Sequence, residues 1–204
     1  MGRFKIKKQD TFIDMTPMSD VMVLLLTFFM LTATFVKDEP VKVNTPGSVS
    51  EIKIPERNLL TIFVERNGKV FMTMDSPDNL GKLAAKMNEN GSLNLSAQEI
   101  EVFKKSPTFG TPLEMVNGWL ARGDAERNDI LLNAGNEGIP CDSINNEFKI
   151  WVKAAREAVP EMRVAIKADQ NTPYSVIKKV MDSLRDLNEN RYNLITSLKA
   201  GDKE

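Results

Sequence analysis

Residues 15–36 read MTPMSDVMVLLLTFFMLTATFV, and this stretch decides how the chain is organised. Fifteen of its 22 residues are apolar, and Asp20 is the only charged residue among them. In a helix that rises about 1.5 Å per residue, 22 residues reach about 33 Å, enough to cross a hydrocarbon core of about 30 Å. The sequence therefore predicts a transmembrane helix over residues 15–36.

The two sides of this span differ in charge. The basic residues Arg3, Lys5, Lys7 and Lys8 precede it, whereas the acidic pair 38–39 follows it. Because Lys and Arg resist translocation, we expect residues 1–14 to form a cytoplasmic tail and the remainder to lie across the membrane, which in a bacterium is the periplasm. A cleaved signal peptide is the alternative, but the apolar run is long for one and residues 32–34 make a poor cleavage site.

Asp20 is the candidate functional residue of the span. A carboxylate about one turn inside the boundary costs about 2.5–3.5 kcal/mol on insertion scales, so function is the default expectation for it. Such a group can carry a proton, being neutral in lipid and ionised where it meets a polar path. The structural alternative is that Asp20 lies near the positive end of the helix dipole, after Thr16 and Pro17, and reaches toward the headgroups.

A row of threonines shares the helical face of Asp20. Steps of seven residues from Asp20 lead to Thr27 and Thr34. Together with Thr16, they are candidate residues lining a pore or a protein–protein seam. The alternative is that these hydroxyls bond back to carbonyl groups of their own helix.

The composition of the whole chain excludes several classes of function. Apolar residues make up 42% and charged residues 27%, which is typical of a globular protein. The 27 Lys and Arg residues nearly balance 28 Asp and Glu residues, which argues against a nucleic-acid partner. With no histidine and with Cys141 as the single cysteine, imidazole catalysis, internal disulfides and CxxC sites are ruled out. We therefore expect no enzyme, no cofactor and no metal site.

Residues 58–204 alternate between β-rich and amphipathic segments. Two β-rich runs flank Asn67–Gly68, which is a strong hairpin signal. Apolar residues at helical spacing predict a helix over 145–158, and Thr172 with Pro173 predicts the cap and first position of another. Strands are expected at 163–167 and 191–195.

Residues 75–138 form a long segment with helix-start signals of its own. These are Ser76–Pro77 and two capping boxes, Ser96 with Glu99 and Thr111 with Glu114. Connections of this length are rarely structureless, so we expect a helical insertion here. It either enlarges the core or contacts an energy-transducing partner or the cell wall.

Residues 37–57 are predicted to form an extended linker with strand character at 41–43. Val41 and Val43 alternate with Lys42 and Asn44, and Pro46 stops the pattern. Such a strand is stable only when it is added to a sheet edge or to another chain. We predict that these five residues form a reversible docking switch, with a passive tether as the alternative.

Three blocks of the sequence resemble the ExbD/TolR family of biopolymer-transport proteins. They are DMTPMSDVM at 14–22, VKVNTP at 41–46, and VAIKAD at 164–169 followed by TPY at 172–174 and VMD at 180–182. Two positions depart from the family pattern: Ser19 replaces an apolar residue found in many relatives, and Thr45 replaces a leucine.

The resemblance implies a fold and a function. The fold would be a single-span transmembrane helix plus a small α+β periplasmic domain, with a short sheet and helices in two layers. The insertion at about 75–138 is similar to those in the Bacteroidetes branch. The implied function is a proton-channel subunit of an inner-membrane motor driven by the proton-motive force, which energises TonB-dependent transport across the outer membrane. Asp20 would carry the protons, which are the coupling ion.

The resemblance also implies partners. Two copies of the chain would lie inside a homopentameric ring of ExbB-like subunits, of the MotA/TolQ/ExbB family, in the lipid bilayer and would act on a TonB-like energy transducer. One alternative is a TolR-like subunit of a Tol-Pal-type envelope-constriction motor whose outer domain binds peptidoglycan. Another is a membrane-anchored periplasmic adaptor without motor function, which would not need Asp20.

Overall fold

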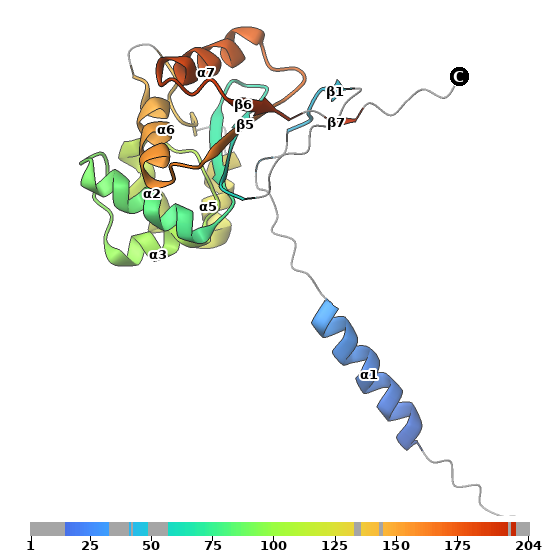
Figure 1. Ribbon diagram of the computed structural model, residues 1–204. Coiled ribbons are helices and arrows are strands. Elements are labelled where there is room, and N and C mark those ends of the chain that lie inside the picture. The colour runs from blue at the N-terminus through green and yellow to red at the C-terminus, as the bar shows by residue number, and fades with distance from the viewer. Residues whose placement is uncertain are drawn as a thin grey trace, which may run out of the picture. The chain divides into compact units, whose positions relative to one another are not determined.

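The computed structural model describes residues 15–32, 41, 43–48, 57–132, 136–142, 145–195 and 197–198. The chain divides into two compact units, residues 1–38 and residues 39–204. Helix α1 (Thr16–Thr32) belongs to the first unit. The other helices and strands belong to the second unit, which is an α+β domain (Figure 1).

The second unit contains short strands and helices in a mixed order. Its helices are α2 (Pro77–Glu89), α3 (Ala97–Lys105), α4 (Val116–Leu120), α5 (Asp124–Leu132), α6 (Glu147–Ala158) and α7 (Tyr174–Asp186), with a 3₁₀ helix η1 (Leu113–Met115). Its strands are β1 (Gly47–Ser48), β2 (Leu59–Val64), β3 (Val70–Met74), β4 (Thr108–Phe109), β5 (Arg163–Ala168), β6 (Tyr192–Leu194) and β7 (Ser197–Leu198).

The main sheet has the strand order β4-β3-β2-β5-β6. The predicted hairpin is confirmed: β2 and β3 are antiparallel, and Gly68 adopts a φ of 84° in the turn between them. β2 also pairs in parallel with β5, which pairs in parallel with β6. β1 and β7 form a separate parallel pair, with Gly47 opposite Ser197.

The two parallel connections determine where α6 and α7 lie. Strands β2, β5 and β6 follow one another in one direction across the sheet, and such crossovers are almost always right-handed. Right-handed crossovers in one direction place their helices on the same face, and α6 and α7 do contact each other. Figure 1 shows α2, α3 and α6 gathered on one side of the sheet.

The core lies between this helical layer and the sheet. Alternate residues of β2 and β5, which share one face, are fully buried: Leu60, Ile62, Val64, Val164 and Ile166. The predicted apolar stripe of α6 is buried as well, and on α7 Val180 and Leu184 are buried while Ile177 and Met181 pack against the core at its edge.

An aromatic cluster joins residues 75–138 to the rest of the domain. Phe103 of α3 stacks on Trp151 of α6 with ring centroids 6.2 Å apart, and Phe109 of β4 lies 4.8 Å from the same indole. Such pairs each add about 0.5–1.5 kcal/mol beyond the area that they bury. Of the two expectations for this segment, the structure therefore supports enlargement of the core by α2, α3 and β4.

The predicted helix-start signals have different outcomes. Ser96 and Glu99 form the expected capping box, with Ser96 Oγ accepting from Glu99 N and Glu99 Oε2 accepting from Ser96 N. The capping box predicted at Thr111 and Glu114 is wrong. A carboxylate oxygen of Glu147, from α6, accepts the Leu113 N–H at 2.8 Å instead, and only η1 forms there.

The predicted cap of α7 is also wrong. Pro173 is the N-cap residue and the helix begins at Tyr174. The Thr172 hydroxyl donates instead to the Val64 carbonyl at 3.4 Å, so this side chain ties the turn to the end of β2.

Candidate functional site

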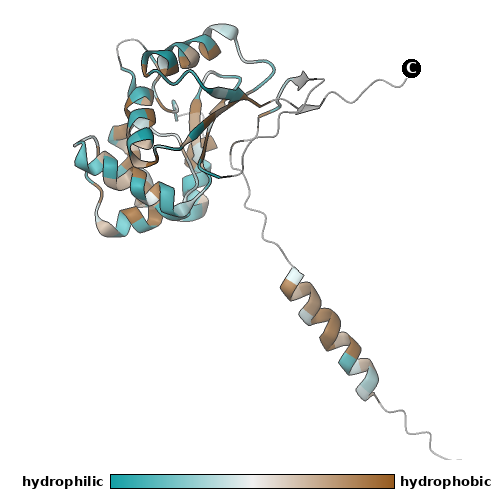
Figure 2. Ribbon diagram, in the orientation of Figure 1, coloured by the Kyte–Doolittle hydropathy of each residue, from teal (hydrophilic) through white to brown (hydrophobic). Residues whose placement is uncertain are grey.

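Helix α1 carries the first group of candidate residues. Asp20 is its only charged residue, and none of its 17 residues is buried. Figure 2 shows the helix apolar along most of its length. The helix spans about 26 Å at 1.5 Å per residue, and the predicted span continues to residue 36, outside the described residues.

Within the residues that the structure describes, no helix is both long enough and apolar enough to cross a membrane.

The threonines of α1 bond within the helix. Thr27 Oγ1 donates to the Leu24 carbonyl at 2.9 Å, and Thr32 Oγ1 donates to the Phe28 carbonyl at 2.8 Å. Thr27 thus bonds to a carbonyl of its own helix, which was the predicted alternative to lining a protein–protein seam. Thr34 lies outside the described residues, and a pore-lining role for Thr16, Thr27 and Thr34 stays a prediction.

The second group of candidates, in the linker, lies against the α+β domain. Val41 is 1% exposed and belongs to the core, and Val43 packs against that core while half-buried. Asn44 N donates to Asp169 Oδ2 at 3.1 Å, and Asn44 O accepts from Gln170 N at 2.8 Å. We call residues 41 and 43–46 the strap, because two hydrogen bonds fasten it to the turn after β5.

The strap corrects one detail of the sequence prediction. The strand expected at 41–43 is absent from the described residues 41 and 43–46, and β1 begins after Pro46 instead of ending before it. The Asp169 side chain takes the Asn44 N–H, and Pro46 has no N–H to donate, so no ladder forms here. Lys42 lies outside the described residues, and a switching role for the strap stays a prediction.

Two carboxyl groups with shifted pKa values lie where the strap is fastened. Backbone N–H groups of Asn171 and Asn44 lower the pKa of Asp169 from its ordinary value of 3.8. Burial raises the pKa of Glu65. The positive charge of the nearby Lys69 lowers this pKa, and the negative charge of Asp169 raises it. The strap is therefore held by a group whose hydrogen-bonding strength depends on its ionisation.

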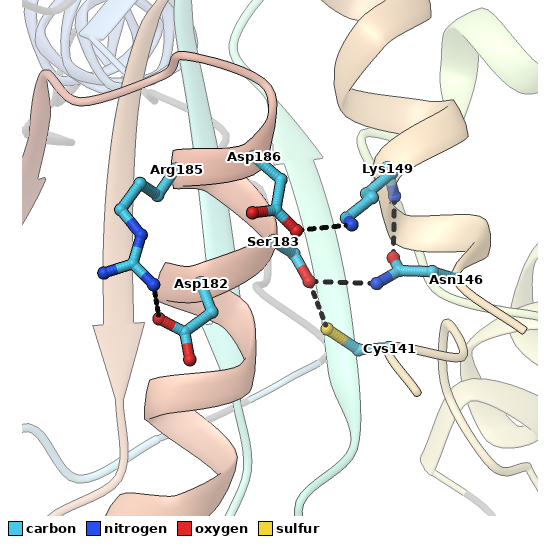
Figure 3. Close-up of polar contacts among 7 residues, drawn as sticks. All are labelled: Cys141, Asn146, Lys149, Asp182, Ser183, Arg185 and Asp186. Carbon is cyan, nitrogen blue, oxygen red and sulfur yellow. Dashed lines mark hydrogen bonds and ion pairs between the residues drawn. The ribbon is translucent and has the colours of Figure 1, made fainter. Parts of the chain in front are cut away.

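A polar cluster joins α6, α7 and the segment before α6 (Figure 3). Asn146 Nδ2 donates to Ser183 Oγ at 2.9 Å, and Asn146 Oδ1 caps α6 by accepting from Lys149 N at 3.1 Å. Cys141 Sγ lies 3.6 Å from Ser183 Oγ, and burial raises the pKa of this thiol. A raised pKa leaves little thiolate at neutral pH, so the cluster holds helices together and does not present a nucleophile.

Sequence reasoning missed Asp169 as the partner of the strap. The turn after β5 has a local signal, because Asp is a common turn residue and Asp169 Oδ1 accepts from Asn171 N in an Asx-type turn. The bond to Asn44 spans 125 residues of sequence and has no local signal.

Comparison with known proteins identifies the class. The model of the family described as "Biopolymer transport protein ExbD/TolR" matches residues 7–104. "Biopolymer transport protein exbD2" of Vibrio cholerae serotype O1 is 28% identical over 67 residues, which are 33% of this chain and 50% of that protein. The chain thus spans about half the length of the curated relative that it matches. No solved structure matches the chain.

Over residues 7–104, the chain is of the ExbD/TolR type. Proteins of this family are membrane-anchored and act in biopolymer transport with ExbB/TolQ-type and TonB-type partners. The match covers α1, the strap, the β2–β3 hairpin, α2 and all but the last residue of α3, and so reaches 30 residues (75–104) into the predicted insertion.

A substitution in the strap tests its attachment to Asp169. Asn44→Pro removes the N–H that Asp169 accepts, so the pKa of Asp169 should rise part of the way to 3.8, because Asn171 still donates. Carbon-13 NMR titration of the carboxyl groups measures this change. In the unsubstituted chain, the lowered pKa means that the contact is fully present above pH 3.8 and weakens as pH falls through the folded-state value.

Glu99 supplies the internal control for this titration. Its pKa is lowered by hydrogen bonds with Ser96, which do not involve the strap, and should be the same in both proteins. An Asp169 pKa that does not change in Asn44→Pro would mean that the strap is not fastened in solution.

Proposed function

We propose that this chain is the proton-conducting subunit of an inner-membrane motor of the ExbB–ExbD type, which energises TonB-dependent transport across the outer membrane. The observation that carries the proposal is a single carboxylate, Asp20, on an otherwise uncharged and fully exposed helix. An exposed apolar helix needs either lipid or protein around it, and a lone acid in such a helix is costly unless it has a task.

The membrane span is part of this proposal. Residues 15–36 would cross the inner membrane, with residues 1–14 in the cytoplasm and the α+β domain in the periplasm. The order of basic residues before the span and acidic residues after it supports this orientation. Membrane anchoring throughout the family supports the span itself.

In the proposed cycle, Asp20 accepts a proton from one side and releases it to the other. Two copies of the chain would turn or shift within a homopentameric ring of ExbB-like subunits, and the proton would neutralise Asp20 while it faces apolar surroundings. The work available is about 2.3 kcal/mol per proton for each 100 mV of membrane potential. The name of the Vibrio cholerae relative, exbD2, favours the ExbD role over the TolR role.

The strap would connect the helix to the outer domain in this cycle. It follows the span in the chain, and its attachment includes two hydrogen bonds and two valine side chains. We propose that movement of α1 releases the strap, which would expose docking surface to a TonB-like transducer. If attachment and release are balanced, only a small bias is needed to shift the strap from one to the other.

Substitution of Asp20 tests the motor. Asp20→Asn keeps the size and hydrogen bonding of the side chain but cannot ionise, so energised uptake should fall to the level of a strain that lacks the protein. Asp20→Glu keeps the ionisable group and should retain part of the uptake. Both are compared at equal protein levels in the membrane. Normal uptake in the Asp20→Asn strain would contradict the ExbD role and leave the TolR-like motor and the adaptor.

Substitution of Val43 tests the switch. Val43→Asp places a carboxylate against the core, at a cost of roughly 1–3 kcal/mol, which is enough to shift docking by about tenfold or more. Uptake and crosslinking to the transducer should change while the domain stays folded. Ile150→Asp introduces the same charge at a side chain that is 39% exposed and should change neither. If Val43→Asp behaves like this control, the strap is a passive tether.

A further inference from the structure

A groove of about 430 Å³ lies beside α4, within residues 111–136. We call it the α4 groove, and its lining includes Thr111, Met115, Gly118, Trp119, Arg122 and Ile130. Its volume lies in the range of about 300–1,000 Å³ that is usual for ligand sites. The residues from 105 onward are beyond the stretch that the ExbD/TolR model matches, so family membership assigns no role to this groove.

The walls of the groove are apolar, and one of them is held rigidly. Trp119 Nε1 donates to the Arg127 carbonyl at 3.1 Å, and the Arg127 guanidinium lies 6.0 Å from the centre of the indole ring. Arg127 in turn donates to the Arg122 carbonyl at 2.8 Å and pairs with Asp124. The indole, which is 3% exposed, therefore forms a fixed inner wall of the groove, beside Met115, which is 59% exposed.

The groove is open at Gly118. A Cβ atom built on Gly118 would meet no atom within 4 Å. Glycine in a helix interior costs roughly 0.5–1 kcal/mol relative to alanine, and no packing contact requires it at this position. A side chain there would instead fill the open space beside Trp119.

Among the described residues, two polar side chains of the groove form no hydrogen bond or ion pair, whereas a third is satisfied. Asn136 Nδ2 donates to the carbonyls of Gly110 and Leu131, and its Oδ1 accepts from Gly138 N. Thr111 is only 4% exposed, yet its hydroxyl bonds to nothing in the described part of the chain. Trp151 Nε1 is the one fully buried side-chain N or O atom without a partner in the described part of the chain, so the Thr111 hydroxyl reaches the open groove. It is therefore free to bond to a ligand there.

Arg122 is the second group without a partner. Its guanidinium forms no ion pair with any described residue, although it borders a groove whose other lining side chains are uncharged. A cation beside an apolar pocket and a free hydroxyl matches a ligand with three parts: an apolar side chain, a peptide group and a carboxylate.

We propose that the α4 groove binds an extended peptide segment of a partner protein in which a branched apolar residue adjoins a carboxylate. The apolar side chain lies between Trp119 and Met115, the peptide group bonds to the Thr111 hydroxyl, and the carboxylate pairs with Arg122. This docking needs neither Asp20 nor proton flow, so it stands or falls separately from the motor.

The two tryptophans of the chain give a direct readout. Both are buried, but Trp119 lines the groove whereas Trp151 lies in the aromatic cluster and does not. Fluorine NMR of the full chain labelled with 5-fluorotryptophan, in detergent, therefore gives one signal from the groove and one from the core away from it. The first probe is N-acetyl-leucine, with N-acetyl-leucinamide as its uncharged match. We expect saturable movement of the Trp119 signal alone, with a Kd of roughly a millimolar for the acid and about tenfold weaker binding of the amide.

Substitutions assign the binding to the groove. Gly118→Leu should abolish binding of both probes while leaving the Trp151 signal in place, which shows that the core is intact. Gly123→Leu is the matched control, because a Cβ on Gly123 also meets no atom within 4 Å and the residue does not line the groove. Arg122→Gln should remove the difference in Kd between N-acetyl-leucine and N-acetyl-leucinamide.

A peptide distinguishes docking of a segment from binding of a single amino acid. Acetyl-Ala-Leu-Asp-Ala-amide should bind more tightly than N-acetyl-leucine, because more of the groove is filled. The proposal is overturned if Trp119 does not respond, if Gly118→Leu binds as well as Gly123→Leu, if acid and amide bind equally, or if the peptide binds more weakly than the single residue.

Discussion

The parallel pairing of β2 with β5 is the interaction on which the rest of the domain depends. Leu59 lies opposite Arg163 and Val64 opposite Ala168, so this pairing closes a loop of about a hundred residues. The hairpin partner β3 lies on one side of the β2–β5 pair and β6 on the other. The crossovers from β2 to β5 and from β5 to β6 run in the same direction across the sheet, so α6 and α7 cover the same face. The turn that leaves β5 contains Asp169 and Gln170, which hold the strap, so the attachment of the linker depends on the same pairing.

Much of the fold could be predicted because its signals are local. Asn67–Gly68 defines the hairpin, and the apolar spacing of α6 and α7 defines their buried faces. The errors have one cause in common: a residue with a good local signal is used by a distant partner. The Thr172 hydroxyl bonds to β2, and at the turn where Thr111 and Glu114 were expected to cap a helix, Glu147 of α6 accepts the Leu113 N–H.

The candidate sites could be predicted to different degrees. Asp20 is evident because one charge in a long apolar run needs no tertiary information. The strap was found from its alternating pattern, but its partner Asp169 was not, since 125 residues separate the two. The α4 groove could not be read from sequence at all. Thr111 and Arg122 look like ordinary polar residues, and only the folded chain places an available hydroxyl and a cation without an ion pair to any described residue at one groove.

The central claim is that residues 15–36 cross a membrane and leave the α+β domain on its far side. It is tested most directly by labelling with a membrane-impermeant maleimide in a Cys141→Ser background, with a cysteine at either Gln9 or Tyr174, whose side chain is 71% exposed. In spheroplasts, the account predicts labelling at position 174 at once and at position 9 only after the membrane is permeabilised. Labelling of both positions without permeabilisation, or recovery of the chain outside the membrane fraction, would contradict it.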